Sequence, residues 1–96
     1  MKLVGRNRLD EFCAKHPDAR EWLENWVADV EAAEWLTPHQ LKAMYPSASL
    51  LGGGSTVFNV RGNNYRLEVT VAYRTSTVVV LWVGTHAEYD ERNKKR

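Results

Sequence analysis

Residues 84–90, Gly-Thr-His-Ala-Glu-Tyr-Asp, concentrate side chains that can exchange protons. Four of them are titratable: His86, Glu88, Tyr89 and Asp90. Histidine, carboxylate and phenol side chains serve as general acids and bases when a reacting group lies within hydrogen-bond reach. We therefore expect acid–base chemistry at this segment, which directly follows a strongly apolar run.

Two arginines lie upstream and could bind a phosphate. Arg61 and Arg66 belong to the run F-N-V-R-G-N-N-Y-R-L at residues 58–67, which also contains Asn59 and Asn63. RNA is cleaved when a base removes the proton of its 2′-hydroxyl, a cation stabilises the charged phosphate oxygens and an acid protonates the departing 5′-oxygen. Arginine, histidine, glutamate and tyrosine suffice for these steps. The residue set is therefore compatible with cleavage of RNA without a metal or an organic cofactor.

These residues also have structural interpretations. Arg66 could form a surface ion pair with Glu68 or Glu88, and such pairs add little stability. Tyr89 could pack against the edge of a sheet. The spacing of His86 and Glu88 matches the H-x-E of zinc deaminases, but no P-C-x-x-C follows and the chain has a single cysteine. We therefore expect no metal site.

A β-hairpin would position the two arginines. Gly62-Asn63 suits a two-residue turn, because such turns need positive φ angles that glycine and asparagine adopt readily. This turn places Asn59 opposite Arg66 and Phe58 opposite Leu67. Polar residues then face polar ones and apolar residues face apolar ones. The pairing supports the register, since a slip by one residue would bury the polar side chains.

Three strands are expected at about residues 56–61, 65–73 and 77–83. Because the third is almost wholly apolar, we expect it to be a central strand buried on both faces. The polar face of the hairpin should carry Asn59, Arg61, Arg66, Glu68 and Thr70. The apolar face should carry Phe58, Val60, Tyr65, Leu67, Val69, Val71 and Tyr73.

Helical spacing of apolar residues predicts three helices before the strands. The first spans about residues 7–15. The second, over residues 18–33, begins with a capping box formed by Asp18 and Glu21 and carries a continuous apolar stripe. The third, over about residues 37–45, begins with a second capping box and a proline. These elements predict an α+β fold with N-terminal helices packed on one face of a small, mainly antiparallel sheet.

Length and composition restrict the class of protein. A chain of 96 residues is expected to form a single domain, residues 1–96. Without an apolar run long enough for a membrane span or a signal peptide, we expect no membrane partner and a cytoplasmic location. The single cysteine, Cys13, excludes an internal disulfide and should be buried. Residues 55–96 carry seven Lys and Arg against four Asp and Glu, so a polyanion should meet this half of the chain.

Four segments of the chain carry a family resemblance. They are Lys15–Ala19, Tyr45–Ser49, Phe58–Leu67 and Gly84–Asp90. Together they resemble the HigB-type toxins of the RelE/ParE toxin superfamily, over about residues 9–90. The resemblance implies a RelE-like fold in which helices precede an antiparallel sheet.

The same resemblance implies a function and partners. It suggests the toxin of a type II toxin–antitoxin system, an mRNA interferase that cleaves mRNA on the ribosome by metal-independent attack of the 2′-hydroxyl. A HigA-type helix-turn-helix antitoxin would inhibit it. The ParE branch of the superfamily acts on gyrase and cuts no RNA. A non-catalytic gyrase inhibitor or an RNA-binding module is therefore the alternative.

The expected roles follow from these residues and the resemblance together. Arg66 should stabilise the transition state, His86 or Glu88 should act as the general base, and Tyr89 should act as an acid or a stacking platform. The expected catalytic residues are Arg66, His86, Glu88 and Tyr89. The expected RNA-binding residues are Asn59, Arg61, Asn63 and Tyr65.

Overall fold

The computed structural model describes residues 1–94. Lys95 and Arg96, the last two of the seven basic residues counted over residues 55–96, lie outside the described residues. In chain order the elements are β1 (Lys2–Val4), α1 (Arg6–Lys15), η1 (Pro17–Ala19), α2 (Arg20–Ala32), α3 (Pro38–Met44), β2 (Ser49–Leu50), η2 (Gly52–Gly54), β3 (Ser55–Val60), β4 (Tyr65–Ala72), β5 (Thr77–Thr85) and α4 (His86–Lys94).

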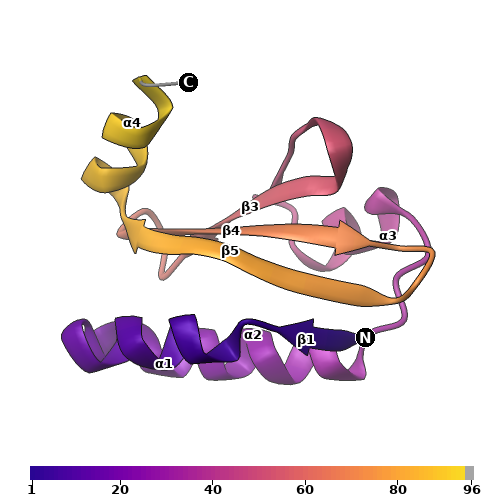
Figure 1. Ribbon diagram of the computed structural model, residues 1–96, viewed down its shortest axis with the longest axis horizontal. Helices are drawn as coiled ribbons and strands as arrows, with labels where there is room; N and C mark the ends of the chain where they lie inside the picture. Colours follow the sequence, from indigo (N-terminus) through magenta and orange to yellow (C-terminus); the bar gives the residue numbers. More distant parts are fainter. Residues whose placement is uncertain (95–96) are drawn as a thin grey trace.

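The strands form one sheet in the order β1-β5-β4-β3-β2. Strand β1 runs parallel to β5, and the other neighbours are antiparallel. Helices α1 and α2 cover one face of the sheet, whereas α4 rises from the end of β5 on the opposite side (Figure 1). The predicted α+β arrangement, with N-terminal helices on one face of a mainly antiparallel sheet, is confirmed.

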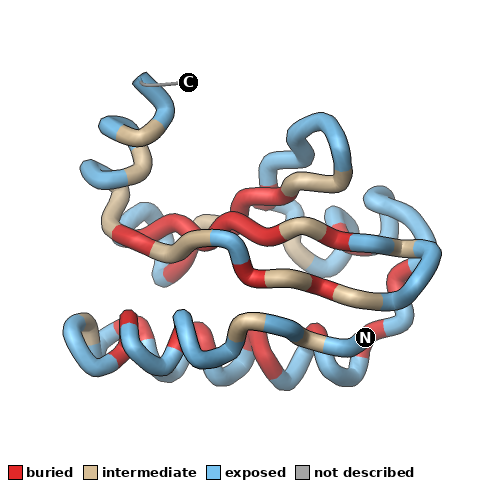
Figure 2. Tube along the Cα trace, in the orientation of Figure 1, coloured by how far each residue is buried: buried red, intermediate tan, exposed pale blue. Residues whose placement is uncertain are grey.

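The hydrophobic core lies between the sheet and the helices beneath it. Buried stretches run along the strands and along the sides of α1 and α2 that face the sheet (Figure 2). The largest fully buried side chains include Trp26 and Leu23 of α2 and Phe58 and Leu67 of the hairpin. Each contributes roughly 1.5–3 kcal/mol by leaving water. Cys13 is buried among them, as predicted, and burial raises the pKa of its thiol.

The helices begin where their sequences favour it, with one exception. Thr37 caps α3 as predicted, because its hydroxyl oxygen accepts a hydrogen bond from the backbone N–H of Gln40 at 3.3 Å. The predicted capping box at the start of α2 is wrong, since α2 has no side-chain cap. The carboxylate of Asp18 instead accepts hydrogen bonds from the Tyr65 hydroxyl at 2.6 Å and from Arg61 at 2.8 Å. A charged donor binds a carboxylate more strongly than a backbone N–H does.

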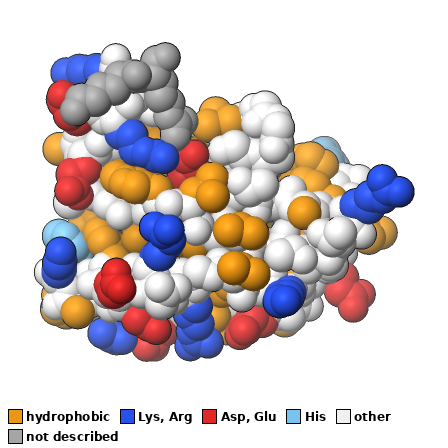
Figure 3. All heavy atoms as spheres, in the orientation of Figure 1, with side chains coloured by type: hydrophobic (Ala, Val, Ile, Leu, Met, Phe, Trp, Pro, Cys, Tyr) orange, Lys and Arg blue, Asp and Glu red, His pale blue; other side chains and the backbone are white. Residues whose placement is uncertain are grey.

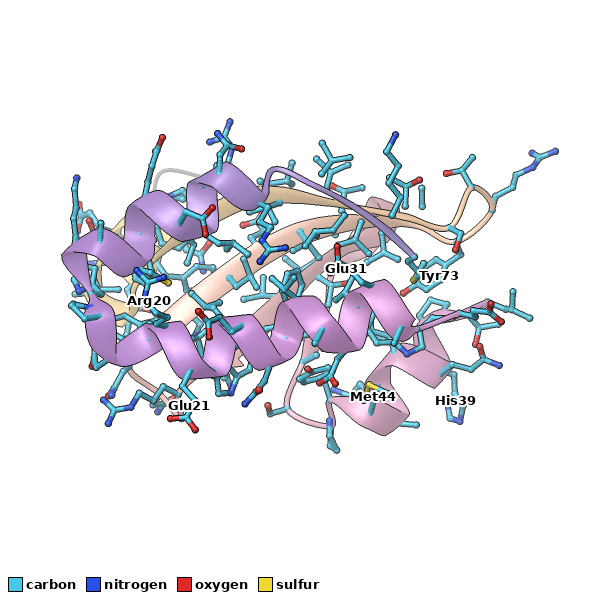
Figure 4. The ribbon with its side chains drawn as sticks, turned by 90° about the horizontal axis from the view of Figure 1, so that it is seen from below. Arg20, Glu21, Glu31, His39, Met44 and Tyr73 are labelled. Carbon is cyan, nitrogen blue, oxygen red and sulfur yellow. The ribbon has the colours of Figure 1, made fainter. Side chains whose placement is uncertain are left out.

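Figure 4 shows how the helices α1, α2 and α3 lie relative to one another. Helices α1 and α2 lie side by side along the sheet, and Arg20 and Glu21 mark the point at which the chain enters α2. Helix α3, which carries the labelled His39 and Met44, lies beside the far end of α2. No helix within residues 1–94 is long and apolar enough to cross a membrane.

The hairpin register is confirmed, but its turn is wider than predicted. Asn59 pairs with Arg66 and Phe58 with Leu67. The ladder stops at Val60, and residues 61–64 form the turn, with positive φ angles at Arg61 (50°) and Gly62 (70°). The positive φ angles therefore fall one residue earlier than a Gly62-Asn63 turn requires.

The strand buried on both faces is β4, not β5. Strand β4 lies in the middle of the sheet, and even its polar residues Arg66 and Glu68 are buried. Strand β5 has a bulge opposite Glu68 and Val69, and Leu81 at this bulge is 39% exposed. The apolar sequence of β5 suggested a strand buried on both faces. However, β5 is covered on one side only by the three-residue strand β1, and the sequence of β5 by itself does not show this.

Asp18 should make the stability of the fold depend on pH. Its hydrogen bond from Tyr65, and then the charge of Arg61, hold its pKa below the ordinary value of 3.8. A carboxylate whose pKa is lower in the folded state stabilises the fold fully at a pH above its unfolded-state pKa. This stabilisation is lost as the pH falls from there through the folded-state pKa. We expect Asp18→Asn to lower the free energy of unfolding at pH 7, with a deficit that shrinks between about pH 5 and pH 3. Urea unfolding across this range measures it, with the exposed Glu34→Gln as control. A deficit independent of pH would contradict this role.

Candidate active site

Arg66 lies in the middle of a row of three residues on neighbouring strands. Its partner in β3 is Asn59 and its partner in β5 is Gly84. Residues paired in this way project to the same face of a sheet, with neighbouring Cβ atoms about 5 Å apart. The row therefore lies on the face opposite α1 and α2, beside the segment that continues from Gly84 into α4. The run 84–90 therefore begins beside the polar face of the hairpin.

Arg66 is buried and bound by neutral oxygen atoms. It is 9% exposed, and its guanidinium donates to the backbone oxygen of Tyr65 at 3.1 Å and to the side-chain oxygen of Asn63 at 2.9 Å. Within residues 1–94 it forms no ion pair with a carboxylate. Glu68 binds Arg92 instead, at 2.6 Å. The positive charge of Arg66 is thus held in place without being neutralised, which suits it to an anionic ligand.

The first turn of α4 is fixed by reciprocal hydrogen bonds. The hydroxyl oxygen of Thr85 accepts from the backbone N–H of Glu88 at 3.1 Å, and the Glu88 carboxylate accepts from the backbone N–H of Thr85 at 2.9 Å. The backbone N–H of Thr85, and then the hydroxyl of Thr85, stabilise the charged Glu88 carboxylate and hold the pKa of Glu88 below its usual value. The arrangement is a capping box. It favours a structural role for Glu88.

His86 and Tyr89 project from the same turn of α4. The segment is helical from His86 onward, so these residues, three positions apart, share a face. The Nδ1 atom of His86 lies 3.2 Å from a carboxylate oxygen of Asp90, and the backbone N–H of His86 donates to the backbone oxygen of Asn64 at 3.1 Å. The second bond fastens α4 to the hairpin turn beside Arg66. The Tyr89 ring lies 6.1 Å from the ring of Trp82.

A cation, an imidazole and a phenol thus come from adjacent parts of one face. Comparison with known proteins identifies the family. The family model described as HigB_toxin, RelE-like toxic component of a toxin-antitoxin system, matches residues 19–92. The chain belongs to the HigB toxin family.

Curated relatives match over nearly the whole length. The chain is 28% identical over 92 residues to the mRNA interferase toxin HigB of Escherichia coli K12, covering 94% of this chain and 88% of the relative. The proteins named mRNA interferase HigB in Escherichia coli O157:H7 and Shigella flexneri match with the same identity and coverage. The region matched by the HigB family model contains the row Asn59–Arg66–Gly84 and α4 as far as Arg92.

In this chain two of the expected RNA-binding residues turn toward the helices. Arg61 leaves the strand alternation where the turn begins and binds Asp18, so its predicted place on the polar face with Asn59 and Arg66 is wrong. Tyr65 is 8% exposed, with its hydroxyl on Asp18 and its ring against Phe12. The hydrogen bond to Asp18 raises the pKa of Tyr65. Arg61 and Tyr65 therefore tie the hairpin to η1.

Arg92 is a residue of the site that the sequence did not single out. Its guanidinium binds the carboxylate of Glu68, which is 4% exposed, and lies 5.1 Å from the centre of the Trp82 ring. Below α4, on the face shown in Figure 3, basic side chains lie next to hydrophobic ones. The signal was the spacing of Tyr89 and Arg92, which places both on one side of a helix. Arg92 holds α4 against the sheet.

Gly84 leaves room for the side chain of Trp82. A Cβ atom at this position would lie 2.4 Å from a ring carbon of Trp82, so the indole occupies the space that a side chain would need.

Within residues 1–94, no group of three or more His, Cys, Asp and Glu side chains is placed to hold a metal ion.

The capping role of Glu88 can be separated from a chemical one. Glu88→Ala should lower the free energy of unfolding by about 1 kcal/mol, because the backbone N–H of Thr85 loses its acceptor. Glu88→Gln should lose less, since its amide oxygen can accept the same hydrogen bond. Urea unfolding of both variants measures this, with the exposed Glu91→Ala of the same helix as control. Equal losses for the two Glu88 variants would contradict the capping box.

Proposed function

We propose that this chain is the toxin of a toxin–antitoxin pair and acts as an mRNA interferase, an endonuclease that cuts mRNA on the ribosome. The observation that carries the proposal is the position of Arg66, which forms no ion pair within residues 1–94, beside the His86–Tyr89 turn of α4. The names of the curated relatives support the substrate class. The partner we propose is a HigA-type helix-turn-helix antitoxin that inhibits cleavage.

The proposed reaction is attack by the substrate's own 2′-hydroxyl on the adjacent phosphate. Asp90 accepts the Nδ1 proton of His86, which leaves Nε2 to take the proton of the 2′-hydroxyl. Arg66 binds the non-bridging oxygens and stabilises the charge that develops on them. Tyr89 protonates the departing 5′-oxygen. The products are a 2′,3′-cyclic phosphate and a free 5′-hydroxyl, and the atoms balance without water or a cofactor.

The remaining polar residues position the groups that act on the RNA. Asn63 positions Arg66 through its side-chain oxygen, and Asn59 lies next to Arg66 on the same face. Arg61 and Tyr65 act indirectly, because their bonds to Asp18 fix the hairpin that carries Arg66. Glu88 fixes the start of the helix that carries His86 and Tyr89.

Arg66→Ala should lower the cleavage rate by on the order of 10²–10³, because removing one group that stabilises transition-state charge commonly has this effect. The rate is measured on purified ribosomes programmed with an mRNA. Arg74→Ala, an exposed arginine in the turn after β4, is the matched control and should cleave at the wild-type rate. His86→Gln should lower the rate and leave RNA affinity nearly unchanged.

Two results would contradict the proposal. A folded Arg66→Ala protein that cleaves at the wild-type rate would remove Arg66 from the site. Wild-type protein that leaves ribosome-bound mRNA intact but inhibits purified gyrase would replace the proposed activity with that of a gyrase inhibitor.

A further inference from the structure

A groove lies at the edge of the sheet beside Asn59, the strand partner of Arg66, where β2 no longer pairs with β3. It has a volume of about 530 Å³, within the range of small-ligand sites. One wall comes from α2, the end of α3 and the segment that follows, and the other from the hairpin. Its lining includes Trp22, Met44, Tyr45, Pro46, Asn59 and Asn63.

We propose that this groove binds an unpaired nucleobase of the RNA, adjacent to the phosphate held by Arg66. The inference rests on the proposed function and extends it to the recognition of sequence. It assigns Asn59 as the residue that reads the edge of the base and Trp22 and Tyr45 as the aromatic wall.

The chemistry of the lining distinguishes a base from a phosphate. No residue that lines this groove carries a charge, whereas the groove between α1 and β5 is lined by Arg8, Glu11, Lys15, His16 and Glu88. A base is an uncharged ring whose edges present hydrogen-bond donors and acceptors. An asparagine amide offers both a donor and an acceptor and can pair with such an edge. Single-stranded RNA bases are commonly bound by aromatic side chains and by polar groups at their edges.

The groove and the phosphate site share residues, so one nucleotide can reach both. Asn59 is the strand partner of Arg66, and Asn63, which lines the groove, accepts a hydrogen bond from Arg66 at 2.9 Å. On the other side of Arg66 the row continues to Gly84 and the start of α4. The groove and the His86–Tyr89 turn therefore flank Arg66. This order would place one base beside the scissile phosphate and leave the opposite side to the acid and base.

The outer wall of the groove is held in place by its own contacts. The Tyr45 hydroxyl donates to Asp29 of α2 at 2.5 Å, and the Tyr45 ring lies 6.1 Å from that of Trp22. Lys42 donates to the backbone oxygen of Ala48 at 2.5 Å, which closes the segment after α3. A wall that is already ordered loses less conformational freedom on binding.

The test uses single-stranded RNA that cannot be cleaved, so that it does not depend on catalysis. Four oligoribonucleotides with a 2′-O-methyl group at the central position differ in one base on one side of it, and their affinities are measured for wild-type protein. We expect one base to be preferred by roughly tenfold or more, the effect of a base paired with an amide. Asn59→Ala should remove most of this preference, and Asn59→Asp should change which base is preferred. The exposed Asn7→Ala, on α1, is the control.

The outcomes separate the groove from the proposed activity. A base preference that Asn59→Ala abolishes supports the groove even if no cleavage is found. Wild-type protein that cleaves RNA but binds the four oligonucleotides equally, or a preference unchanged in both Asn59 variants, overturns the groove and leaves the activity standing. Asn59 variants that keep the preference but lose affinity for the antitoxin would assign the surface to a protein partner and also overturn it.

Discussion

The antiparallel register of β3, β4 and β5 is the constraint on which the candidate site depends. It places Arg66 between Asn59 and Gly84, and it brings the beginning of α4 beside the hairpin turn. A slip by one residue would turn Arg66 toward the core between the sheet and helices α1 and α2. Two nearby carboxylates do not pair with Arg66, because each has a hydrogen-bond partner of its own. Glu68 is bound by Arg92 and Glu88 by its own helix start, so these nearby carboxylates are engaged elsewhere.

Helix α4 is connected to this row by several independent contacts. The capping box fixes its first turn, and the bond from the His86 backbone to Asn64 fastens it to the hairpin. Trp82 fills the space above Gly84 and contacts Tyr89, while Arg92 reaches back to Glu68. The orientation of the proposed acid and base therefore depends on side chains that take no part in the chemistry. Catalytic groups are most effective when such supporting contacts hold them.

Local patterns in the sequence predicted much of the fold and drew attention to the residues of the candidate site. The alternation of polar and apolar residues gave the pairing of Asn59 with Arg66, and helical spacing located α1 and α2. What local patterns could not predict depends on contacts between distant segments. Asp18 looked like a helix cap, but its partners Arg61 and Tyr65 come from the hairpin. The neutral groove joins α2, the end of α3 and β3, so no single stretch of sequence contains it.

The chemical identity of the cleaved ends tests the central claim most directly. If His86 and Arg66 act on the 2′-hydroxyl and the adjacent phosphate, the wild-type protein leaves a 2′,3′-cyclic phosphate on the upstream fragment and a 5′-hydroxyl on the downstream fragment. The downstream ends can be examined by asking whether polynucleotide kinase can label them without prior removal of phosphate, and the upstream ends by mass spectrometry. We predict labelling and a cyclic phosphate mass. Downstream fragments that carry a 5′-phosphate would require attack by water and would contradict the account.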